Sequence, residues 1–251
     1  MLHPPWRRIA ACACALAVLT AGCGGGGGGL VGENPTVFLV NASPDSAALD
    51  FLLNEDVRGL DFQYLETALD FEQIPFISDA DGAYDLITRD NVTGEEYDAE
   101  NRVFDRSTDS AIIAVGIQGF VAGEEIKRLR SIVVDIDRTV PNGNKARLYV
   151  VHAFVRETGF STPQIVFQNA GDNPQFATGG IDFASTASLT VDSGTMDWVA
   201  KREDADSPVI YAQKTETLDP GGLYLVLVSG VENDPDAAKQ PKLTFVKLTT
   251  E

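Results

Sequence analysis

The apolar residues of the chain lie in short segments that are separated by Gly, Pro, Asn and Asp and are rich in β-branched and aromatic side chains. This pattern predicts β-strands, because such side chains pack well on a pleated sheet. Nearly continuous apolar runs predict central strands that are covered on both faces. Three segments are of this kind: "TVFLV" (36–40), "AIIAVGI" (111–117) and "LYLVLV" (223–228).

Other segments alternate between apolar and polar residues, as strands with one buried face do. In "AYDLITR" (83–89), Tyr84 and Leu86 are expected to point inward and Asp85 outward. The one stretch that suggests a helix is "GEEIKRLRSIVV" (123–134), and its second half has a strand pattern. The sequence therefore predicts an all-β fold.

An internal repeat determines the expected architecture. Residues 68–90 align without a gap within residues 180–203 at a constant offset of 112. The aligned pairs include Asp70 with Asp182, Phe71 with Phe183, Ile77 with Leu189, Gly82 with Gly194 and Asp85 with Asp197. The match extends to 111–119 with 223–230, 131–137 with 243–249, 37–42 with 148–153 and 49–54 with 164–169.

The repeat divides the chain into two units, residues 33–140 and residues 144–251, joined by "VPNGNK" (140–145). Six to eight short strands in about 110 residues favour a sandwich over a closed barrel. We therefore predict two tandem immunoglobulin-like β-sandwich domains. Because the joint is short, the two units are expected to touch.

Residues 1–22 have the features of a bacterial lipoprotein signal peptide. A basic start is followed by "IAACACALAVLTAG" (9–22), which is shorter than the roughly 20 apolar residues that span a bilayer. The segment runs into "LTAGC", which resembles a lipobox, so lipidation of Cys23 is expected. An ordinary secretory signal with an incidental cysteine is the alternative.

Residues 23–32 hold the cysteine and a run of glycines, which predicts a flexible tether. Gly24 rather than Asp after the cysteine favours the outer membrane, by resemblance to lipoprotein sorting. We therefore expect a cell-envelope protein that reaches the membrane through its N-terminal lipid anchor, with its body facing either the periplasm or the cell surface.

Composition narrows the chemistry further. The chain has 37 acidic and 19 basic residues, a net charge of −18, and removal of residues 1–22 takes away two arginines and brings the charge to −20. Such a chain repels nucleic acid, so no nucleic-acid partner is expected. Cys12 and Cys14 leave with the signal and Cys23 takes the lipid, so no disulfide or catalytic thiol is predicted.

A single histidine, His152, remains after residue 22. One histidine without a free cysteine excludes ordinary zinc sites. A serine hydrolase of the G-x-S-x-G type requires that motif, and the sequence does not contain it. We therefore expect His152 to be structural, and we predict no catalytic residue and no cofactor.

A signature near the start of the first unit is similar to that of a known bacterial family. "VFLVNASPDSAALDFLLN" (37–54) holds a strand, an N-A-S-P-D turn at 41–45 and a strand beginning with Leu49 and Asp50. Together with Phe71, Phe76, Gly82 and Tyr84 downstream, this segment resembles the family catalogued as domain of unknown function 4397.

That resemblance implies tandem immunoglobulin-like modules that are secreted or lipid-anchored, and it implies no established activity. The second copy departs from the pattern, because "FVRETGF" (154–160) replaces S-P-D and Met196 stands where Tyr is usual. It keeps His152, Ala153, Phe183 and Gly194. The turn itself needs no chemistry: Pro44 fixes φ, and the side chains of Ser43 and Asp45 are expected to bond to nearby backbone N–H groups.

The most metal-like stretch is "SDADGAYD" (78–85), in which Asp79, Asp81 and Asp85 surround Gly82. It fails as an EF-type loop, because Ile77 and Thr88 would fall on the first and twelfth ligand positions. A weaker calcium site formed by Asp79, Asp81 and Asp85 stays open.

The second copy has Val191 and Ser193 where the first has Asp79 and Asp81. What the copies share is Asp-Gly or Ser-Gly before an alternating strand, which predicts hairpin turns with Gly82 and Gly194 as structural residues.

The leading functional hypothesis is a non-enzymatic cell-envelope lipoprotein that presents two immunoglobulin-like modules for binding or scaffolding, with an envelope protein or a polysaccharide as partner. One alternative is a carbohydrate-active hydrolase that uses carboxylates at the domain interface. The other is a calcium-stiffened adhesion module with an ion near the joint. A cleft lined by acids between the units would support the hydrolase, and an apolar interface would argue against it.

Overall fold

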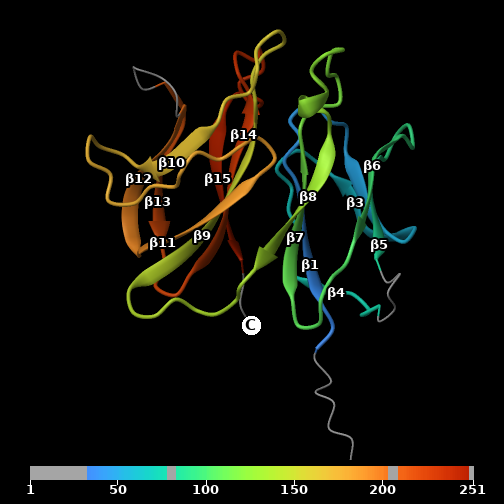
Figure 1. The fold of residues 1–251 in the computed structure, drawn as a ribbon, viewed down its shortest axis with the longest axis horizontal. Helices are drawn as coiled ribbons and strands as arrows, with labels where there is room; N and C mark the ends of the chain where they lie inside the picture. The colour runs from blue at the N-terminus through green and yellow to red at the C-terminus, as the bar shows by residue number, and fades with distance from the viewer. Residues whose placement is uncertain (1–32, 78–82, 203–208, 249–251) are drawn as a thin grey trace, which may run out of the picture. The chain divides into compact units, whose positions relative to one another are not determined.

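The computed structural model describes residues 33–77, 83–202 and 209–248, which belong to one compact unit, Gly32–Glu251. These residues form fifteen strands, and their one helical element is a single 3-10 turn, η1 (Glu125–Lys127) (Figure 1). In this part of the chain no helix has the length and apolar character needed to cross a membrane. The predicted all-β fold built of sandwiches is confirmed.

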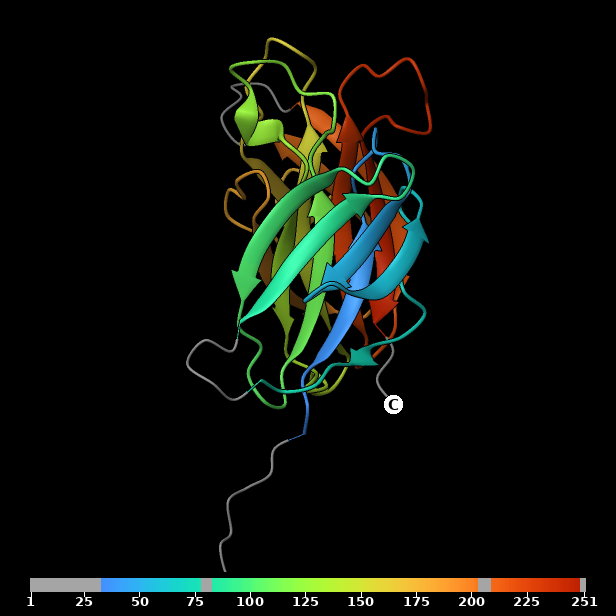
Figure 2. The same cartoon turned by 90° about the vertical axis from the view of Figure 1, so that its right-hand side faces the viewer.

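The first eight strands form one sandwich of two four-stranded sheets. Its inner sheet has the order β4-β1-β7-β8 and its outer sheet the order β3-β2-β5-β6. Figure 2 shows the outer sheet in front of the inner one. The strands are β1 (Thr36–Asn41), β2 (Leu49–Leu53), β3 (Asp56–Phe62), β4 (Glu72–Gln73), β5 (Tyr84–Asp90), β6 (Glu96–Arg102), β7 (Asp109–Val115) and β8 (Arg130–Ile136).

The last seven strands form the second sandwich. Its inner sheet has the order β11-β9-β14-β15 and its outer sheet the order β10-β12-β13. The strands are β9 (Lys145–Val155), β10 (Ile165–Asn169), β11 (Thr186–Asp192), β12 (Gly194–Arg202), β13 (Ile210–Leu218), β14 (Leu223–Val231) and β15 (Lys242–Leu248).

The four sheets are stacked as four layers with three apolar cores between them (Figure 1). Each sandwich has a core of its own. A third core joins the two inner sheets and contains Phe38 and Val40 of β1, Val151 of β9, and Leu225 and Leu227 of β14. The two sandwiches therefore share a buried contact, in which their two inner sheets pack face to face.

This stacking explains the continuously apolar segments. The residues of β1, β7 and β14 are almost all buried, because one face of each strand lines the core of its sandwich and the other face lines the shared core. The prediction of central strands covered on both faces is confirmed. In β5, Tyr84 and Leu86 are buried and Asp85 is exposed, also as predicted.

Strand pairing corrects the repeat alignment at β7 and β14. Residues 130–136 of β8 correspond to 242–248 of β15 at the predicted offset of 112. Ala111 pairs with Val134, however, whereas Leu225 pairs with Val246. Strands β7 and β14 are therefore related by an offset of 114, and the alignment of 111 with 223 was wrong by two residues. A shift of two keeps the same face of each strand inward, so the apolar pattern could not reveal it.

A glycine stands at the equivalent place in both copies, directly after β7 in the first and one residue before the end of β14 in the second. Gly116 has φ of 98° and Gly230 has φ of 118°, a region that non-glycine residues avoid. A Cβ at Gly116 would lie 2.5 Å from the carbonyl oxygen of Arg128, and at Gly230 it would lie 2.5 Å from that of Gln240. Both positions require glycine because the backbone of the neighbouring connection passes so close.

The turn at Ser193–Gly194 is not a hairpin. It follows β11, which belongs to the inner sheet, and it leads into β12, which belongs to the outer sheet. Gly194 has φ of 120°, which suits a corner between sheets as well as it suits a hairpin. The hairpin prediction for this turn was wrong because an alternating strand after a Gly turn does not show which strand it pairs with. Gly82 lies outside the described residues.

Candidate functional site

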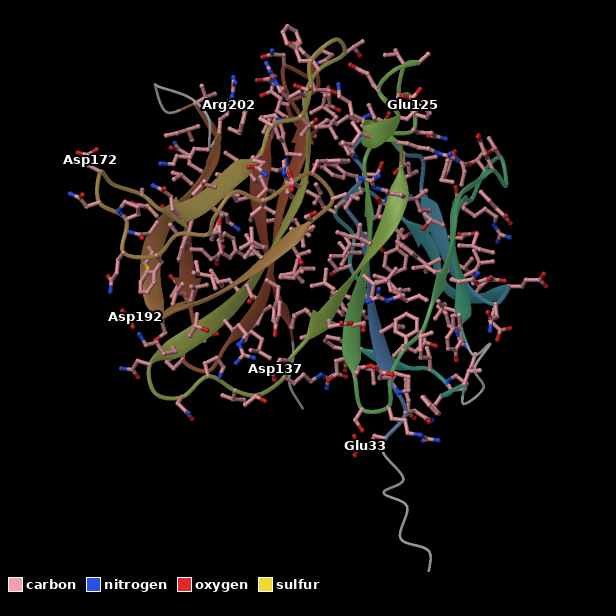
Figure 3. All side chains as sticks on the ribbon, in the orientation of Figure 1. Glu33, Glu125, Asp137, Asp172, Asp192 and Arg202 are labelled. Atoms are coloured by element: carbon pink, nitrogen blue, oxygen red, sulfur yellow. The ribbon has the colours of Figure 1, made fainter. Side chains whose placement is uncertain are left out.

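Loops of both sandwiches gather at the end of the body opposite Glu33, as the labels of Glu33 and Glu125 in Figure 3 show. The carbonyl of Glu33 accepts a hydrogen bond from the N–H of Ser107, just before β7 begins. The connections beyond the far ends of the strands are called here the distal loops, residues 42–48, 91–95, 116–129, 156–164 and 232–241.

The predicted turn at 41–46 is held by side chains of its own segment. The Oδ1 atom of Asn41 accepts a hydrogen bond of 2.9 Å from the N–H of Ser43. The hydroxyl of Ser46 donates to the carbonyl of Ser43 over 3.1 Å. Asn41 also donates from Nδ2 to the carbonyl of Phe62 over 2.9 Å, which ties the turn to β3.

Asp45 has a different partner from the one predicted. Its two carboxylate oxygens accept hydrogen bonds from the N–H groups of Gln118 (2.8 Å) and Gly119 (3.0 Å), more than seventy residues away. The hydroxyl of Ser43 is buried and has no hydrogen-bond partner among the described residues. The expectation that both side chains bond to nearby backbone was therefore wrong: Asp45 fixes a remote loop.

The side chain of Gln118 continues this network into the outer sheet. Its Nε2 donates to the carboxylate of Asp90 over 3.2 Å and to the hydroxyl of Tyr97. The other oxygen of Asp90 accepts from the N–H groups of Val92 (2.8 Å) and Thr93 (2.7 Å). Burial acts to raise the pKa of Asp90, but these N–H donors outweigh it and hold that pKa below its ordinary value.

A pocket of about 240 Å³ opens beside this network at the distal end of the first sandwich. It lies between the start of β6 and the connection from β7 to β8, and it is lined by Glu95, Tyr97, Ile117, Gln118, Phe120, Arg128 and Leu129. None of these residues carries a sequence motif. They come together only because strands of two sheets end at the same place, so the sequence offered no signal for the pocket.

At the same end of the second sandwich, the described residues include an aromatic pair and an ion pair. The ring of Tyr211, on β13, packs against Phe154 with their centroids 4.4 Å apart. Beside them, Arg156 forms an ion pair with Glu232, with 2.6 Å between Nε and Oε2.

The distal loops of the two sandwiches are joined by polar contacts. The ammonium of the buried Lys127 lies 3.0 Å from the carboxylate of Glu124 and donates over 3.0 Å to the carbonyl of Glu157 in the second sandwich. The carboxylate of Glu124 also accepts from the N–H of Gly159 over 2.7 Å. These bonds fix the loops of the first sandwich against those of the second.

His152 lies within β9 and is buried, consistent with a structural role. Its Nδ1 is 2.9 Å from the carbonyl of Ile181, and its ring stacks on Phe154. Burial lowers the pKa of His152 to about 4, so the imidazole is neutral at neutral pH.

The residues named for lipidation and calcium are mostly beyond the described part of the chain: Cys23, Asp79 and Asp81 lie outside it. Asp85 is described, and its side chain is exposed while its backbone bonds to Asn54. Among the side chains of residues 33–77, 83–97, 101–202 and 209–248, no group of three His, Cys, Asp or Glu is placed to hold a metal ion. Lipidation of Cys23 and a weak calcium site of Asp79, Asp81 and Asp85 both stay predictions.

The interface between the two sandwiches is apolar. Aliphatic and aromatic side chains of both inner sheets fill it, including Phe38, Ile113, Val151, Leu225 and Leu248. Near the joint, the carboxylate of Asp137 forms an ion pair with the guanidinium of Arg147 at 2.6 Å. A hydrolase with carboxylates in a cleft between the units is not favoured by this arrangement, because apolar packing occupies the position where the cleft would be.

No protein-family model and no curated protein matches the sequence. Among solved structures, the chain is similar to CBMbc, a family CBM26 module of Eubacterium rectale Amy13K crystallised with maltoheptaose, at 9% identity and a TM-score of 0.26, over 86% of this chain and 98% of that one. It is also similar to proteins of Bacteroides ovatus (7% identity, TM-score 0.22, 87% and 97% covered) and Bacteroides eggerthii (10%, 0.24, 88% and 98%), both provisionally assigned to cell adhesion. Likeness at these TM-scores adds nothing to the β-sandwich fold that the strand pairing establishes.

Proposed function

We propose that the protein is a non-enzymatic cell-envelope lipoprotein whose two sandwiches present the distal loops for binding. In this proposal Cys23 carries the lipid, residues 24–32 form the tether, and the outer membrane holds the anchor. The observation that carries it is the position of Glu33, where the body begins, at the end opposite the distal loops. A body tethered at Glu33 would present those loops away from the membrane.

The packing between the sandwiches supports a presenting role. Three cores in series and the bonds from Lys127 and Glu124 to the second sandwich make the body a continuous stack. The ten residues from Cys23 to Glu33 span at most about 33–36 Å when extended. Because the stack is continuous, the body would not bend between its two halves, and the distal loops would project away from the membrane.

Exposed apolar side chains on the distal loops also support binding, since apolar groups on loops commonly mark interaction sites. Val92 is 80% exposed, Ile126 60%, Phe160 49% and Val121 42%. They come from three different distal loops and from both sandwiches. The resemblance of residues 37–54 to the family of domain of unknown function 4397 is consistent with this role, because that family implies anchored modules without an activity.

The lipid anchor is tested by expressing the full chain in a double-membraned bacterium with labelled palmitate. We expect label on the wild-type chain, recovery in the outer-membrane fraction, and loss of both in Cys23→Ser. The control Cys14→Ser changes a cysteine of the predicted signal and should leave both unchanged. Label that persists in Cys23→Ser, or a wild-type chain recovered without label, would refute the anchor.

A further inference from the structure

We propose that the pocket at the distal end of the first sandwich binds one ring of a neutral polyhydroxylated ligand, that is, a single sugar unit. This inference deepens the proposed binding function and rests on it. The pocket is the cavity of about 240 Å³ between Glu95 and Tyr97 on one side and the connection containing Gln118, Phe120 and Arg128 on the other.

The size of the pocket restricts its ligand to one small ring. Pockets that enclose drug-sized molecules have volumes of roughly 300–1,000 Å³. At about 240 Å³ this pocket is smaller than that range. It has room for a single ring or a side chain, and a longer ligand would have to leave the rest of its length outside.

The polar groups of the pocket wall that are free to bond to a ligand determine which class of ligand the pocket can bind. Neither Glu95 nor Arg128 has an ion-pair partner among the side chains of residues 33–77, 83–97, 101–202 and 209–248, and both are exposed at the pocket. Gln118 uses Nε2 for Asp90 and Tyr97, so the remaining polar atom of its amide is the acceptor Oε1. The wall therefore offers guanidinium donors together with carboxylate and amide acceptors.

A ligand that satisfies such a mixed wall must both donate and accept without a large charge of its own. An anion would gain Arg128 but would meet Glu95 and the field of a chain with net charge −18. A cation would gain Glu95 and meet Arg128. Hydroxyl groups donate and accept equally, and the ring of Phe120 with Ile117 and Leu129 gives the apolar surface against which the C–H face of a sugar can lie.

The part of the wall formed by Gln118 and Gly119 is fixed in place before any ligand arrives. Asp45 holds the backbone of Gln118 and Gly119, and Asp90 and Tyr97 hold the Gln118 side chain. Binding then orders few groups, which lowers its entropic cost.

In two other hollows of the described surface, the charged side chains already have partners. One, on the outer face of β12 and β13, is lined by Asp197 and Lys214, but Asp197 accepts from Thr215 and Lys214 pairs with Glu216 at 2.7 Å. The other lies at residues 219–223, where Asp219 pairs with Lys247 at 2.7 Å. Their charged groups already have partners, so they offer less to a ligand than Glu95 and Arg128 do.

The test is titration of the purified full chain in detergent by calorimetry and by saturation-transfer NMR. The probes are glucose, galactose, mannose, N-acetylglucosamine and the disaccharides of each, with inorganic phosphate as the anionic probe. We expect at least one sugar to bind, and we expect Arg128→Ala and Glu95→Ala each to weaken its binding at least tenfold. Gln213→Ala, in the hollow on β12 and β13, is the matched control and should bind as the wild type does.

Three results would overturn the inference: no sugar of the panel binds, sugar binding is unchanged in Arg128→Ala and Glu95→Ala, or phosphate binds in place of sugar. Because both residues are exposed, the variants are expected to fold, and unfolding midpoints equal to that of the wild type would verify this. Failure here with palmitate labelling of Cys23 intact would refute the sugar site alone. Loss of labelling with sugar binding intact would refute the anchor and leave the pocket standing.

Discussion

Apart from the additional edge strand β3 of the first, the two sandwiches have the same strand order, but different side chains occupy their distal ends. Asn41 pairs with Ala114 in the first sandwich as His152 pairs with Val228 in the second, so the positions beyond them can be matched. The matched positions of the two sandwiches are Ser43 and Phe154, Asp45 and Arg156, Tyr97 and Tyr211, and Gln118 and Glu232.

In the second sandwich these positions are filled by an aromatic pair and an ion pair, Phe154 with Tyr211 and Arg156 with Glu232. In the first sandwich they hold Ser43 and a hydrogen-bonded network from Asp45 to Asp90 and Tyr97. The difference teaches that one fold can hold an aromatic pair and an ion pair at this end in one copy and a hydrogen-bonded network beside a pocket in the other. If the proposed sugar site is correct, binding is placed on the first repeat while the second uses the matched positions for packing.

The largest expected effect comes from the matched pair Phe154 and Ser43. Phe154→Ala should lower the free energy of unfolding by about 3–5 kcal/mol, because it removes a buried ring that packs on Tyr211 and His152. Ser43→Ala should be neutral or stabilising by up to about 1 kcal/mol, because it removes a buried hydroxyl without a partner. Urea unfolding of both variants measures this, and a large loss in Ser43→Ala would contradict the comparison.

The next largest effect is the pH dependence of the free energy of unfolding. His152 contributes to it, and Asn41, its matched residue in the first sandwich, does not. The pKa of His152 is lowered to about 4 in the fold by burial, against an ordinary value of 6.5. The unfolded chain therefore takes up a proton as pH falls through 6.5, while the folded chain does so only near 4. The stability from the neutral imidazole is complete above pH 6.5 and is lost as pH falls toward 4, by about 3 kcal/mol in all.

Replacing His152 by the residue of the first copy isolates this effect. His152→Asn should remove the contribution, so the difference in unfolding free energy between wild type and variant should shrink by about 3 kcal/mol from pH 7 to pH 4. The carboxylates are the same in both proteins, so their contributions cancel in the difference. A difference that stays constant over this range would show that His152 keeps an ordinary pKa in the fold.

The sequence predicted the layers of this molecule better than its sites. Apolar runs in β1, β7 and β14 indicated strands buried on both faces, because a strand covered by two sheets has no polar side to show. The alternation in β5 indicated its inward side chains. What failed depended on which strand lies beside which: the offset of β14, the sheet change at Gly194, and the partner of Asp45 are all long-range pairings that local pattern does not encode.

The pocket shows the same limit more strongly. Glu95, Gln118 and Arg128 look like ordinary loop residues in the sequence, and the residues that drew attention, Asp79 and Asp81, did so through a local motif. The turn signature was informative in a different way from the one expected. Its aspartate, Asp45, is part of the support for Gln118, so the signature marks the end of the sandwich that stays open.

The smallest expected effect is the difference in stability loss between two polar contacts at the distal ends. One is the contact of Asp45 with its backbone donors, and the other is the ion pair of Glu232 with Arg156. Asp45→Asn replaces a carboxylate that accepts two backbone N–H bonds by an amide that can accept only at one oxygen, and it should lower the free energy of unfolding by about 1–2 kcal/mol. Glu232→Gln removes the charge from a pair whose side chains are 17–18% exposed, and a loss of no more than about 1 kcal/mol is expected.

Salt sharpens this last contrast. The loss in Glu232→Gln should shrink in high salt, because an ion pair near the surface is screened, whereas the loss in Asp45→Asn should persist, because its bonds run to backbone donors. Urea unfolding of both variants at low and high sodium chloride measures the two losses. Because Asp45 positions Gln118, Asp45→Asn should also weaken sugar binding, which Glu232→Gln should leave unchanged. Equal effects of the two variants on binding would mean that the distal ends act as one surface, and the division of roles between the copies would be wrong.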